Sequence, residues 1–485
     1  MTELLGSGMW AGKIYSGGWV DGSGGSYASV APATGERLGD VGAAGPGDVR
    51  RAVQLARDSQ QDWAVTPYDR RAAVLRRAAD LMEEHEDEMA RWAVREAGVP
   101  RYWAGVAGPA EEFRQAATLA SAPLGHVLPS AQPRLSLTRR LPVGVVGVIA
   151  PFNAPIMLAV RALAPALALG NAVVLKPDPR TAVCGGVLLA RLLEEAGLPP
   201  GLLHVLPGGG DIGRDLVRDP DVAVIAFTGS VAAGREVAKL AAPLLKRVHL
   251  ELGGNSAIVV LDDADLEHAV QAGSFGSFHH AGQVCMAASR HLVAAPVVEQ
   301  YTALLGQRAQ RLRVGDPADE DVAYGPLIDQ AARDRVHAVV RDSVAAGARL
   351  VTGGSYDRLY YQPTVLADVP LAAPAYQEEI FGPVAPIVAV KDIDEAARLA
   401  AGTEYGLSLA VLTRDVLKGL ALADRVPVGM VHINDQTSTD EPIAPFGGMR
   451  LSGNGFRIGG PDANIQAFTE TQWITVNQQV PSYPF

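Results

Sequence analysis

Short apolar runs alternate with segments of helical periodicity between residues 143 and 245. Strands are predicted at 143–150, 172–175, 202–206 and 222–227, and helices at 157–169, at 178–195, up to 217 and up to 245. Asp178 fits the N-cap of the second helix and Pro179 its first position, and Gly197 follows its end. Strand–helix alternation at this spacing forms βαβ units and a parallel sheet. The sequence therefore predicts an α/β protein.

The remaining segments extend this pattern. Further strands are predicted at 257–261, 291–295, 383–390 and 409–413, and a helix at 331–347. Residues 48–96 have helical periodicity, and the acidic residues at 83–88 are predicted to face solvent. Residues 1–45 are predicted to form an edge hairpin or loop, whereas 134–140 alternates like an exposed strand. A final predicted strand at 472–477 is suited to pairing with another subunit.

Length and charge exclude several classes of protein. A chain of 485 residues suggests two or three domains. The net charge of −11 argues against a nucleic-acid partner, because such proteins neutralise phosphates with clustered Lys and Arg. No uninterrupted apolar run reaches about 18 residues, so no membrane span is expected. The start of the chain lacks the pattern of a signal peptide, and two cysteines give no disulfide framework, so a cytoplasmic location is expected.

Several polar or glycine residues follow the predicted strands. Ligands of parallel sheets bind beyond the carboxyl ends of the strands, where Asn153, Lys176 and Gly229 are expected. Residues 208–213 match the phosphate-binding pattern G-x-G-x-x-G between a strand and a helix. Residues 228–234 form a competing glycine turn at the start of the next helix. For either segment alone, ordinary turn formation is the alternative.

Cys285 and Glu251 form a candidate nucleophile and general base. Cys285 follows a glycine turn, and Glu251 lies at the end of a probable strand. A thiolate is a strong nucleophile, and a carboxylate beside it can activate water in a second, hydrolytic step. The alternative is that Cys285 is an inert core residue, as is predicted for Cys184. The adjacent histidines at 279–280 have no third ligand at a useful spacing, so no metal site is predicted.

Taken in order, these residues resemble the aldehyde dehydrogenase superfamily over essentially the whole chain. The resemblance is carried by residues 151–155, 176–177, 227–230 with Gly234, 251–254, 282–285, 379–383 and 445–448. It implies a Rossmann-like parallel-sheet cofactor domain, an α/β catalytic domain and a small β oligomerisation module. The implied boundaries are 1–123 with 143–253, then 254–451, and 124–142 with 467–485.

The same resemblance implies a role for each site residue. Cys285 attacks the aldehyde carbon to give a thiohemiacetal, and the Asn153 side chain and the Cys285 backbone N–H hold the oxyanion. After hydride transfer to a nicotinamide, Glu251 activates water to hydrolyse the thioester. The implied cofactor residues are Lys176 and Glu379 at the riboses, Gly229, Ser230 and Gly234 at the pyrophosphate, Phe381 at the nicotinamide ribose, and Phe152. The G-x-G-x-x-G match at 208–213 is then a decoy.

Other segments resemble the benzaldehyde and vanillin dehydrogenase branch, which oxidises aromatic aldehydes. These are 151–155, 176–180, Arg161 with 164–167, and 434–437. The implied substrate tunnel consists of Ala154, Met157, Arg161, Val284, Met286 and Phe446, with ordinary packing as the alternative. Arg161 either recognises a polar substituent of the substrate or pairs internally. NAD is the expected cofactor. NADP is the alternative, because Pro179 stands where members that prefer NAD commonly carry a glutamate, and a missing carboxylate removes repulsion against a 2′-phosphate.

The sequence thus predicts an NAD(P)-dependent aromatic aldehyde dehydrogenase that forms a homodimer or homotetramer and binds neither nucleic acid nor membrane. Three alternatives compete with it. The first is an aliphatic or semialdehyde dehydrogenase. The second is an enzyme that transfers the acyl group to coenzyme A, which Glu251 disfavours because such enzymes generally lack this base. The third is a catalytically silent structural or binding protein.

Overall fold

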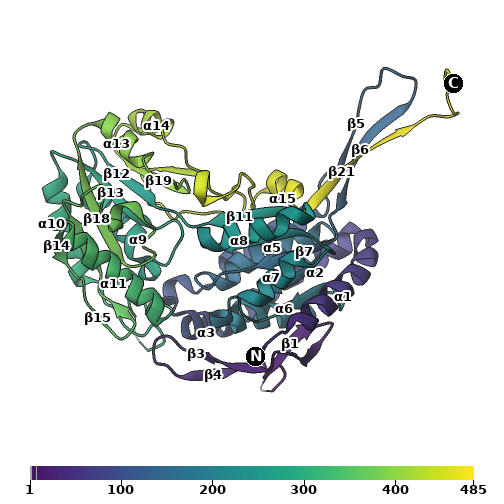
Figure 1. Cartoon of the computed structure of the whole chain (residues 1–485), viewed down its shortest axis with the longest axis horizontal. Helices are drawn as coiled ribbons and strands as arrows, with labels where there is room; N and C mark the ends of the chain where they lie inside the picture. Colours follow the sequence, from purple (N-terminus) through teal and green to yellow (C-terminus); the bar gives the residue numbers. More distant parts are fainter. Residues whose placement is uncertain (1–2, 7, 320) are drawn as a thin grey trace.

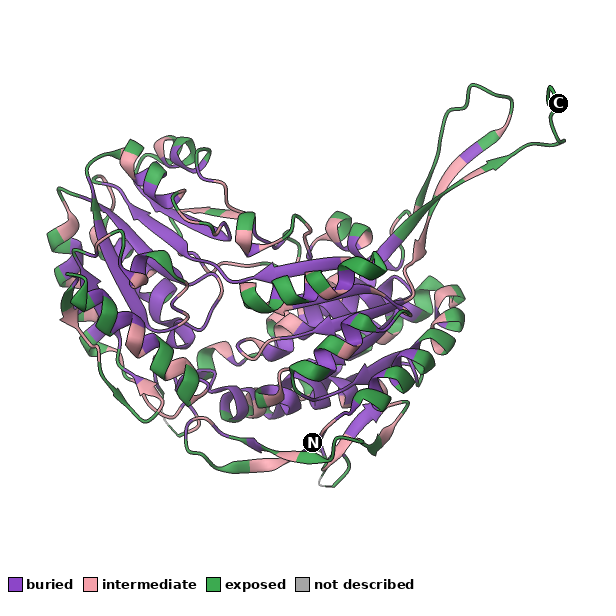
Figure 2. Cartoon of the chain, in the orientation of Figure 1, coloured by how far each residue is buried: buried purple, intermediate pink, exposed green. Residues whose placement is uncertain are grey.

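The computed structural model describes residues 3–6, 8–319 and 321–485. Two seven-stranded sheets, each covered by helices, lie side by side, and a thin three-stranded arm extends from the first of them (Figure 1). Buried residues follow the strands of both sheets, and exposed residues lie on the outer sides of the helices (Figure 2). The prediction of an α/β protein is confirmed.

The first sheet has the strand order β11-β10-β7-β8-β9-β1-β2. Its strands are β1 (Lys13–Ser16), β2 (Trp19–Asp21), β7 (Val145–Ile149), β8 (Ala172–Lys176), β9 (Leu203–Val205), β10 (Val222–Gly229) and β11 (Arg247–Leu252). Strands β7 to β11 are parallel, whereas β1 and β2 add an antiparallel edge. Every residue of β7 and β8 is buried, as a parallel sheet between layers of helices requires.

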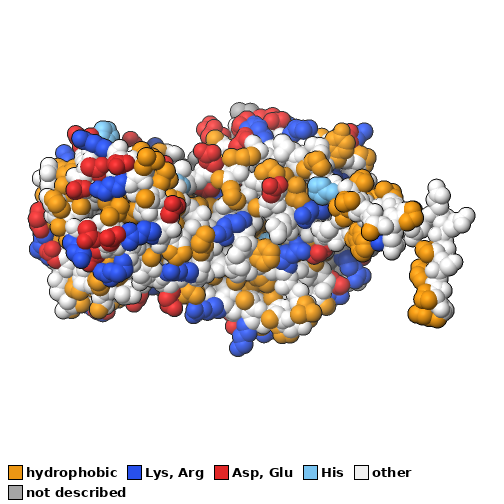
Figure 3. Space-filling view, turned by 90° about the horizontal axis from the view of Figure 1, so that it is seen from above, with side chains coloured by type: hydrophobic (Ala, Val, Ile, Leu, Met, Phe, Trp, Pro, Cys, Tyr) orange, Lys and Arg blue, Asp and Glu red, His pale blue; other side chains and the backbone are white. Residues whose placement is uncertain are grey.

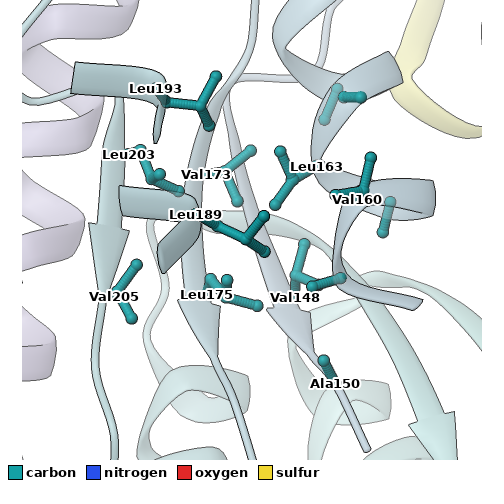
Figure 4. Close-up of a cluster of buried hydrophobic side chains, with 14 of the residues drawn as sticks. Val148, Ala150, Val160, Leu163, Val173, Leu175, Leu189, Leu193, Leu203 and Val205 are labelled. Atoms are coloured by element: carbon teal, nitrogen blue, oxygen red, sulfur yellow. The ribbon is translucent and has the colours of Figure 1, made fainter. Parts of the chain in front are cut away.

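Helices with apolar faces cover this sheet. They are α1 (Pro46–Val65), α2 (Tyr68–Glu84), α3 (Glu86–Ala97), α4 (Ala107–Leu119), α5 (Pro155–Ala168), α6 (Leu188–Glu195), α7 (Gly210–Arg218) and α8 (Val231–Ala241). Figure 4 shows Leu163 of α5 and Leu189 of α6 beside Val173 and Leu175 of β8. These aliphatic side chains hold α5 against the sheet, and the start of α5 is where Asn153 lies.

The second sheet has the order β14-β17-β18-β13-β12-β19-β20. Its strands are β12 (Ser256–Val260), β13 (Ala288–Ala294), β14 (Arg349–Thr352), β17 (Thr364–Ala367), β18 (Val384–Val390), β19 (Ser408–Leu412) and β20 (Met430–Ile433). Its helices are α9 (Leu266–Phe278), α10 (Val298–Arg311), α11 (Gln330–Ala345), α12 (Pro374–Gln377), α13 (Ile393–Ala400) and α14 (Val416–Ala423). Short ribbons β3 (Ser26–Val30) with β4 (Arg37–Gly42) and β15 (Tyr356–Asp357) with β16 (Tyr360–Tyr361) complete the body.

The arm consists of β5 (Gly125–Val127), β6 (Leu135–Pro142) and β21 (Thr469–Val476), and α15 (Pro461–Phe468) leads into it. All three strands pair antiparallel. The arm stands away from the body in Figure 1, and hydrophobic side chains lie along its surface in Figure 3. No helix in the described ranges is long and apolar enough to cross a membrane.

Two expectations about helices were wrong in detail. The acidic residues at 83–88 do not all face solvent, because Glu88 is buried and accepts the backbone N–H groups of Leu4 and Leu5 at 2.6 and 2.9 Å. The helix expected at 178–195 is not continuous. A 3₁₀ turn at Pro179–Thr181 and a π-helical turn at Val183–Val187 precede α6, although Asp178 caps the first turn as predicted.

Candidate active site

One cavity of about 640 Å³ collects most of the site residues that the sequence predicted. It lies beyond the carboxyl ends of β7, β8, β10 and β11, and residues from the second half of the chain, among them Cys285 and Glu379, close it. Ten predicted residues line it: Phe152, Asn153, Lys176, Gly229, Ser230, Glu251, Cys285, Glu379, Phe381 and Phe446. The parallel topology brings those of the first sheet together, because the carboxyl ends of its strands meet at one edge.

Asn153 and the loop of Cys285 are joined by a hydrogen bond. The Asn153 Nδ2 donates to the backbone oxygen of Gln283 at 2.9 Å. Gln283 is itself fixed, because its Oε1 accepts the N–H of Ile328 at 2.9 Å. The loop begins with left-handed backbone at His280 and Ala281, with φ of 48° and 55°. Because strained backbone persists only where its surroundings hold it, this loop presents Cys285 in a defined position beside an amide donor.

The surroundings of Cys285 disfavour its thiolate. Burial raises the pKa of the Cys285 thiol to about 12, and the negative charges of Glu379 and Glu251 act in the same direction. The side chain is nonetheless partly exposed to the cavity. A thiolate there needs a positive charge or a proton acceptor brought to the site.

Glu251 is a buried carboxylate with a free acceptor on each oxygen. It lies at the end of β11, and within the described part of the chain neither oxygen has a hydrogen-bond partner. Burial raises the pKa of Glu251 well above its usual value, and the charges of Arg457 and Arg161 oppose this shift. A carboxylate in such a setting is a strong proton acceptor once ionised, which is the property that a general base needs.

The far part of the cavity fits a dinucleotide. Lys176 ends β8, and burial lowers the pKa of its amine. Glu379 accepts the backbone N–H of Gly254 at 3.2 Å, and burial raises the pKa of this carboxyl to about 7. Both side chains suit ribose hydroxyls. Ser230 caps α8 by accepting the N–H of Ala233 at 3.3 Å, so the positive end of this helix faces the cavity where a pyrophosphate would lie.

Aromatic rings form another wall of the cavity. Phe152 and Phe381 meet edge to face with ring centroids 5.9 Å apart. The guanidinium of Arg180 lies 4.3 Å from the centroid of the Phe152 ring. The donors, the helix end and these rings therefore provide what a nicotinamide dinucleotide requires.

The comparison with known proteins agrees with this geometry. Residues 19–474 match the Aldehyde dehydrogenase family. The chain belongs to this family. It is 56% identical over 480 residues to a vanillin dehydrogenase from Amycolatopsis sp., with 98% of each chain covered. It is 49% identical over 490 residues to a benzaldehyde dehydrogenase [NAD(+)] from Pseudomonas putida, with 100% of each chain covered.

A solved structure of the family has the same fold. A salicylaldehyde dehydrogenase from Pseudomonas putida G7, crystallised with salicylaldehyde, superposes with a TM-score of 0.94 at 34% identity. The alignment covers 98% of this chain and 99% of that one. The predicted aldehyde dehydrogenase fold, with its Rossmann-like sheet, is thereby confirmed.

The predicted substrate residues fall into two groups. Val284, Met286 and Phe446 are buried in one apolar cluster that Cys285 also contacts. Ala154 and Met157 lie at the N-cap and in the first turn of α5, and neither lines the large cavity. Whether these residues contact an aldehyde stays a prediction, but the three in the cluster lie beside the nucleophile.

Arg161 pairs internally, as one of its two interpretations expects. Its Nε lies 2.9 Å from Glu112 Oε1, and its Nη2 lies 2.6 Å from Asp440 Oδ2. The guanidinium also lies 4.9 Å from the centroid of the Phe446 ring. Arg161 therefore supports a ring of the apolar cluster, while a direct contact with substrate stays a prediction.

Some residues lie differently from their predicted places. Gly234 is a buried residue of α8, where an added Cβ would lie 2.4 Å from a methyl carbon of Leu252, and it does not line the cavity. Gly210 and Gly213 of the supposed decoy segment do line it. Four further charged residues line the cavity without having been predicted there: Asp178, Arg180, Arg214 and Arg335. Asp178 and Arg180 directly follow the Lys-Pro pair at 176–177, and this proximity was the available signal.

Proposed function

We propose that this aldehyde dehydrogenase oxidises an aromatic aldehyde to the carboxylic acid with NAD. The observation that carries the proposal is the meeting of Cys285, Asn153 and Glu251 in one cavity, beside an apolar cluster. The cluster suits an aromatic ring. The names of the two relatives reported above, a vanillin and a benzaldehyde dehydrogenase, support the same substrate class.

In the proposed reaction Cys285 forms the covalent bond. Its thiol first gives up its proton to water. The sulfur then attacks the aldehyde carbon, and the carbonyl oxygen becomes an oxyanion that the Asn153 amide and the Cys285 backbone N–H stabilise. One such donor is typically worth about 2.7–4 kcal/mol. When bound, the nicotinamide accepts the hydride that leaves the former aldehyde carbon. Glu251 then takes a proton from water, whose oxygen attacks the thioester, and Cys285 leaves as the free thiol.

The choice of NAD has support from Arg180. Its guanidinium donates to Asp178 Oδ2 at 2.8 Å and to Asp329 Oδ2 at 2.6 Å. With two carboxylate partners and the Phe152 ring, Arg180 is not free to bind the 2′-phosphate of NADP. The benzaldehyde dehydrogenase relative carries NAD(+) in its name. NAD is therefore the proposed cofactor, and NADP is the alternative.

We also propose the domain boundaries given above, a homodimeric or homotetrameric assembly through the arm, and action in the cytoplasm. The arm exposes Val127 and Trp473, which are 77% and 61% accessible to solvent in the single chain. Both cysteines are free thiols, which suits a reducing compartment.

The test is the appearance of reduced cofactor with purified protein, comparing benzaldehyde, hexanal and succinic semialdehyde with NAD and with NADP. We expect benzaldehyde with NAD to give the highest kcat/KM, and Cys285→Ala to abolish turnover. A preference for hexanal or the semialdehyde would refute the aromatic substrate and keep the mechanism. Absence of turnover with every aldehyde, although cofactor binds, would instead favour the silent binding protein.

A further inference from the structure

The segment that follows Phe446 is tied to the strand that carries Glu251. Glu251 and Gly453 form an isolated antiparallel bridge. Asn454 bonds the same strand twice: its Oδ1 accepts the N–H of Leu250 at 3.2 Å, and its Nδ2 donates to the oxygen of Val248 at 2.7 Å. Groups on this segment are therefore held at a fixed place relative to the Glu251 carboxylate.

Gly447 marks the place where an arginine approaches Glu251. Its φ is 151°, and a Cβ built on it would lie 2.8 Å from Glu251 Oε1 and 3.0 Å from Arg457 Nη1. The carboxylate and the guanidinium thus flank one point that only a glycine leaves open. Arg457 is fixed there, because its Nη1 donates to the oxygens of Gly448 and Phe456 at 2.9 and 3.0 Å.

Arg457 differs from the other arginine near Glu251. Arg161 is held between Glu112 and Asp440, so its positive charge is already balanced. Arg457 forms no ion pair with any carboxylate among the residues that the structure describes. Of the charges that favour ionised Glu251, that of Arg457 has the largest effect and that of Arg161 follows, while Asp440 opposes them.

The positively charged side chains that line the cavity, Lys176, Arg180, Arg214 and Arg335, are not among the main influences on the pKa of Glu251. Cys285 and Glu379 face the cavity there with Glu251, and a thiolate or a carboxylate would disfavour a second negative charge. A small void lies behind the carboxylate and is lined by residues such as Thr228 and Phe446. Among the described residues, Arg161 is the one charged side chain besides Glu251 that lines this void. The ionised form of Glu251 therefore depends mainly on the segment that carries Arg457.

We propose that Arg457 is a positioning residue that keeps Glu251 ionised for hydrolysis of the thioester. The inference rests on the proposed function, in which Glu251 takes the proton of the attacking water. The water oxygen bonds to the acyl carbon, the carbon–sulfur bond breaks, and the sulfur leaves with its electron pair and regains a proton. Without the positive charge of Arg457, Glu251 would hold its proton to higher pH, and only this second half of the reaction would be slowed.

The test compares Arg457→Met with Arg450→Met. Arg450 lies on the same segment and also donates to two backbone oxygens, but it is exposed. Enzyme, benzaldehyde and NAD are mixed at pH values between 6 and 10 and quenched in acid at intervals. The mass of the protein, measured by mass spectrometry, then reports the formation and the decay of the thioester separately. We expect the midpoint of thioester decay to rise by about one pH unit or more in Arg457→Met, as for loss of a neighbouring opposite charge.

The controls separate charge from structure. Formation of the thioester at the alkaline end should stay within about twofold of the wild type in Arg457→Met. Arg457→Lys should restore much of the midpoint, whereas Arg450→Met should leave it unchanged. An unshifted midpoint in Arg457→Met, or a shift that Arg457→Lys does not reduce, overturns the inference. If Arg457→Met does not fold, Arg457→Gln takes its place in the same comparison. Failure of the wild-type enzyme to form any thioester would refute the proposed function itself.

Discussion

At the scale of single residues, the surroundings of the nucleophile oppose its ionisation. Burial raises the pKa of the Cys285 thiol, and so do nearby carboxylates, of which Glu379 and Glu251 have the largest effects. Glu379, which the cofactor ribose is expected to contact, has the larger effect of the two. The positive nicotinamide ring of a bound cofactor would act against these charges. In the enzyme without cofactor, Cys285 is therefore expected to be mainly a thiol, which is far less reactive than a thiolate.

We expect Glu379→Gln to lower the pKa of Cys285 in the free enzyme. The variant removes a negative charge and keeps the shape of the side chain, so the thiolate is less disfavoured by about one pH unit. Iodoacetamide should then modify Cys285 several-fold faster at pH 8, as measured by mass spectrometry of the modified peptide. Glu378→Gln is the matched control, since Glu378 is the exposed neighbour. Equal rates in both variants would show that Glu379 does not govern the thiol.

The sequence could indicate which residues meet but not how they are charged. Cys285, Glu251 and Asn153 were assigned from their motifs, and the structure places them in one cavity. The partners of Arg161 are a different case. Glu112 and Asp440 lie 49 and 279 positions away from it by their numbers in the chain, and only the fold brings them together. The same holds for Arg457, whose approach to Glu251 depends on the bridge between two distant segments.

At the scale of elements, the segment after β8 shows why a helix boundary can be hard to predict. The capping residue Asp178 was predicted correctly, but the regular α-helix begins only at Leu188. Glu96, from α3, accepts the N–H groups of Val183 and Cys184 at 3.1 and 2.7 Å. A buried carboxylate thus takes the place of the preceding helical turn. Its position in the chain, far from this segment, gives no local sign of that role.

The π-helical turn also lets α5 approach closely. Gly185 lies against Pro155, the first residue of α5, and an added Cβ would stand 2.9 Å from the Pro155 Cβ. Asn153 directly precedes this helix. A larger residue at 185 would therefore push on the element that positions the amide donor of the oxyanion. The strand–helix pattern predicted both helices, but this contact depends on their packing.

We expect Gly185→Ala to slow thioester formation by about tenfold or more, because small displacements of a positioned group have large effects on rate. The rate is measured as the appearance of reduced cofactor during the first turnover. Gly47→Ala in α1 is the matched control, since no atom lies within 4 Å of the added Cβ there. Thermal unfolding of both variants is recorded alongside. A first turnover in Gly185→Ala equal to that in Gly47→Ala would contradict the proposed role of this contact.

At the scale of the whole molecule, the cavity exists because two sheets meet. The first sheet supplies Asn153, Lys176 and Glu251 at its strand ends, and the second half of the chain supplies Cys285 and Glu379. The alternation of strands and helices predicted a parallel sheet and the same pattern in the second half of the chain. It could not predict their relative placement, which depends on contacts between residues that are far apart in sequence. That the two halves share one site was implied by the family resemblance alone, through the joint roles of Asn153 and Cys285.

The arm provides the last prediction, which concerns assembly. A ribbon of three strands away from the body has no core of its own, and Val127 and Val476 on it are 77% and 51% exposed in the single chain. Isolated ribbons with exposed apolar residues are marginally stable and mark interaction surfaces.

We expect the wild type to sediment as a dimer or tetramer, and Val127→Asp with Val476→Asp to shift it to a smaller species. Val65→Asp, at a site 81% exposed on α1, is the control and should keep the assembly. A monomeric wild type, or an unchanged mass in the arm variant, would mean that the arm does not hold subunits together. Since the catalytic residues all lie within one chain, the smaller species should retain thioester formation, and its loss would show that assembly also shapes the cavity.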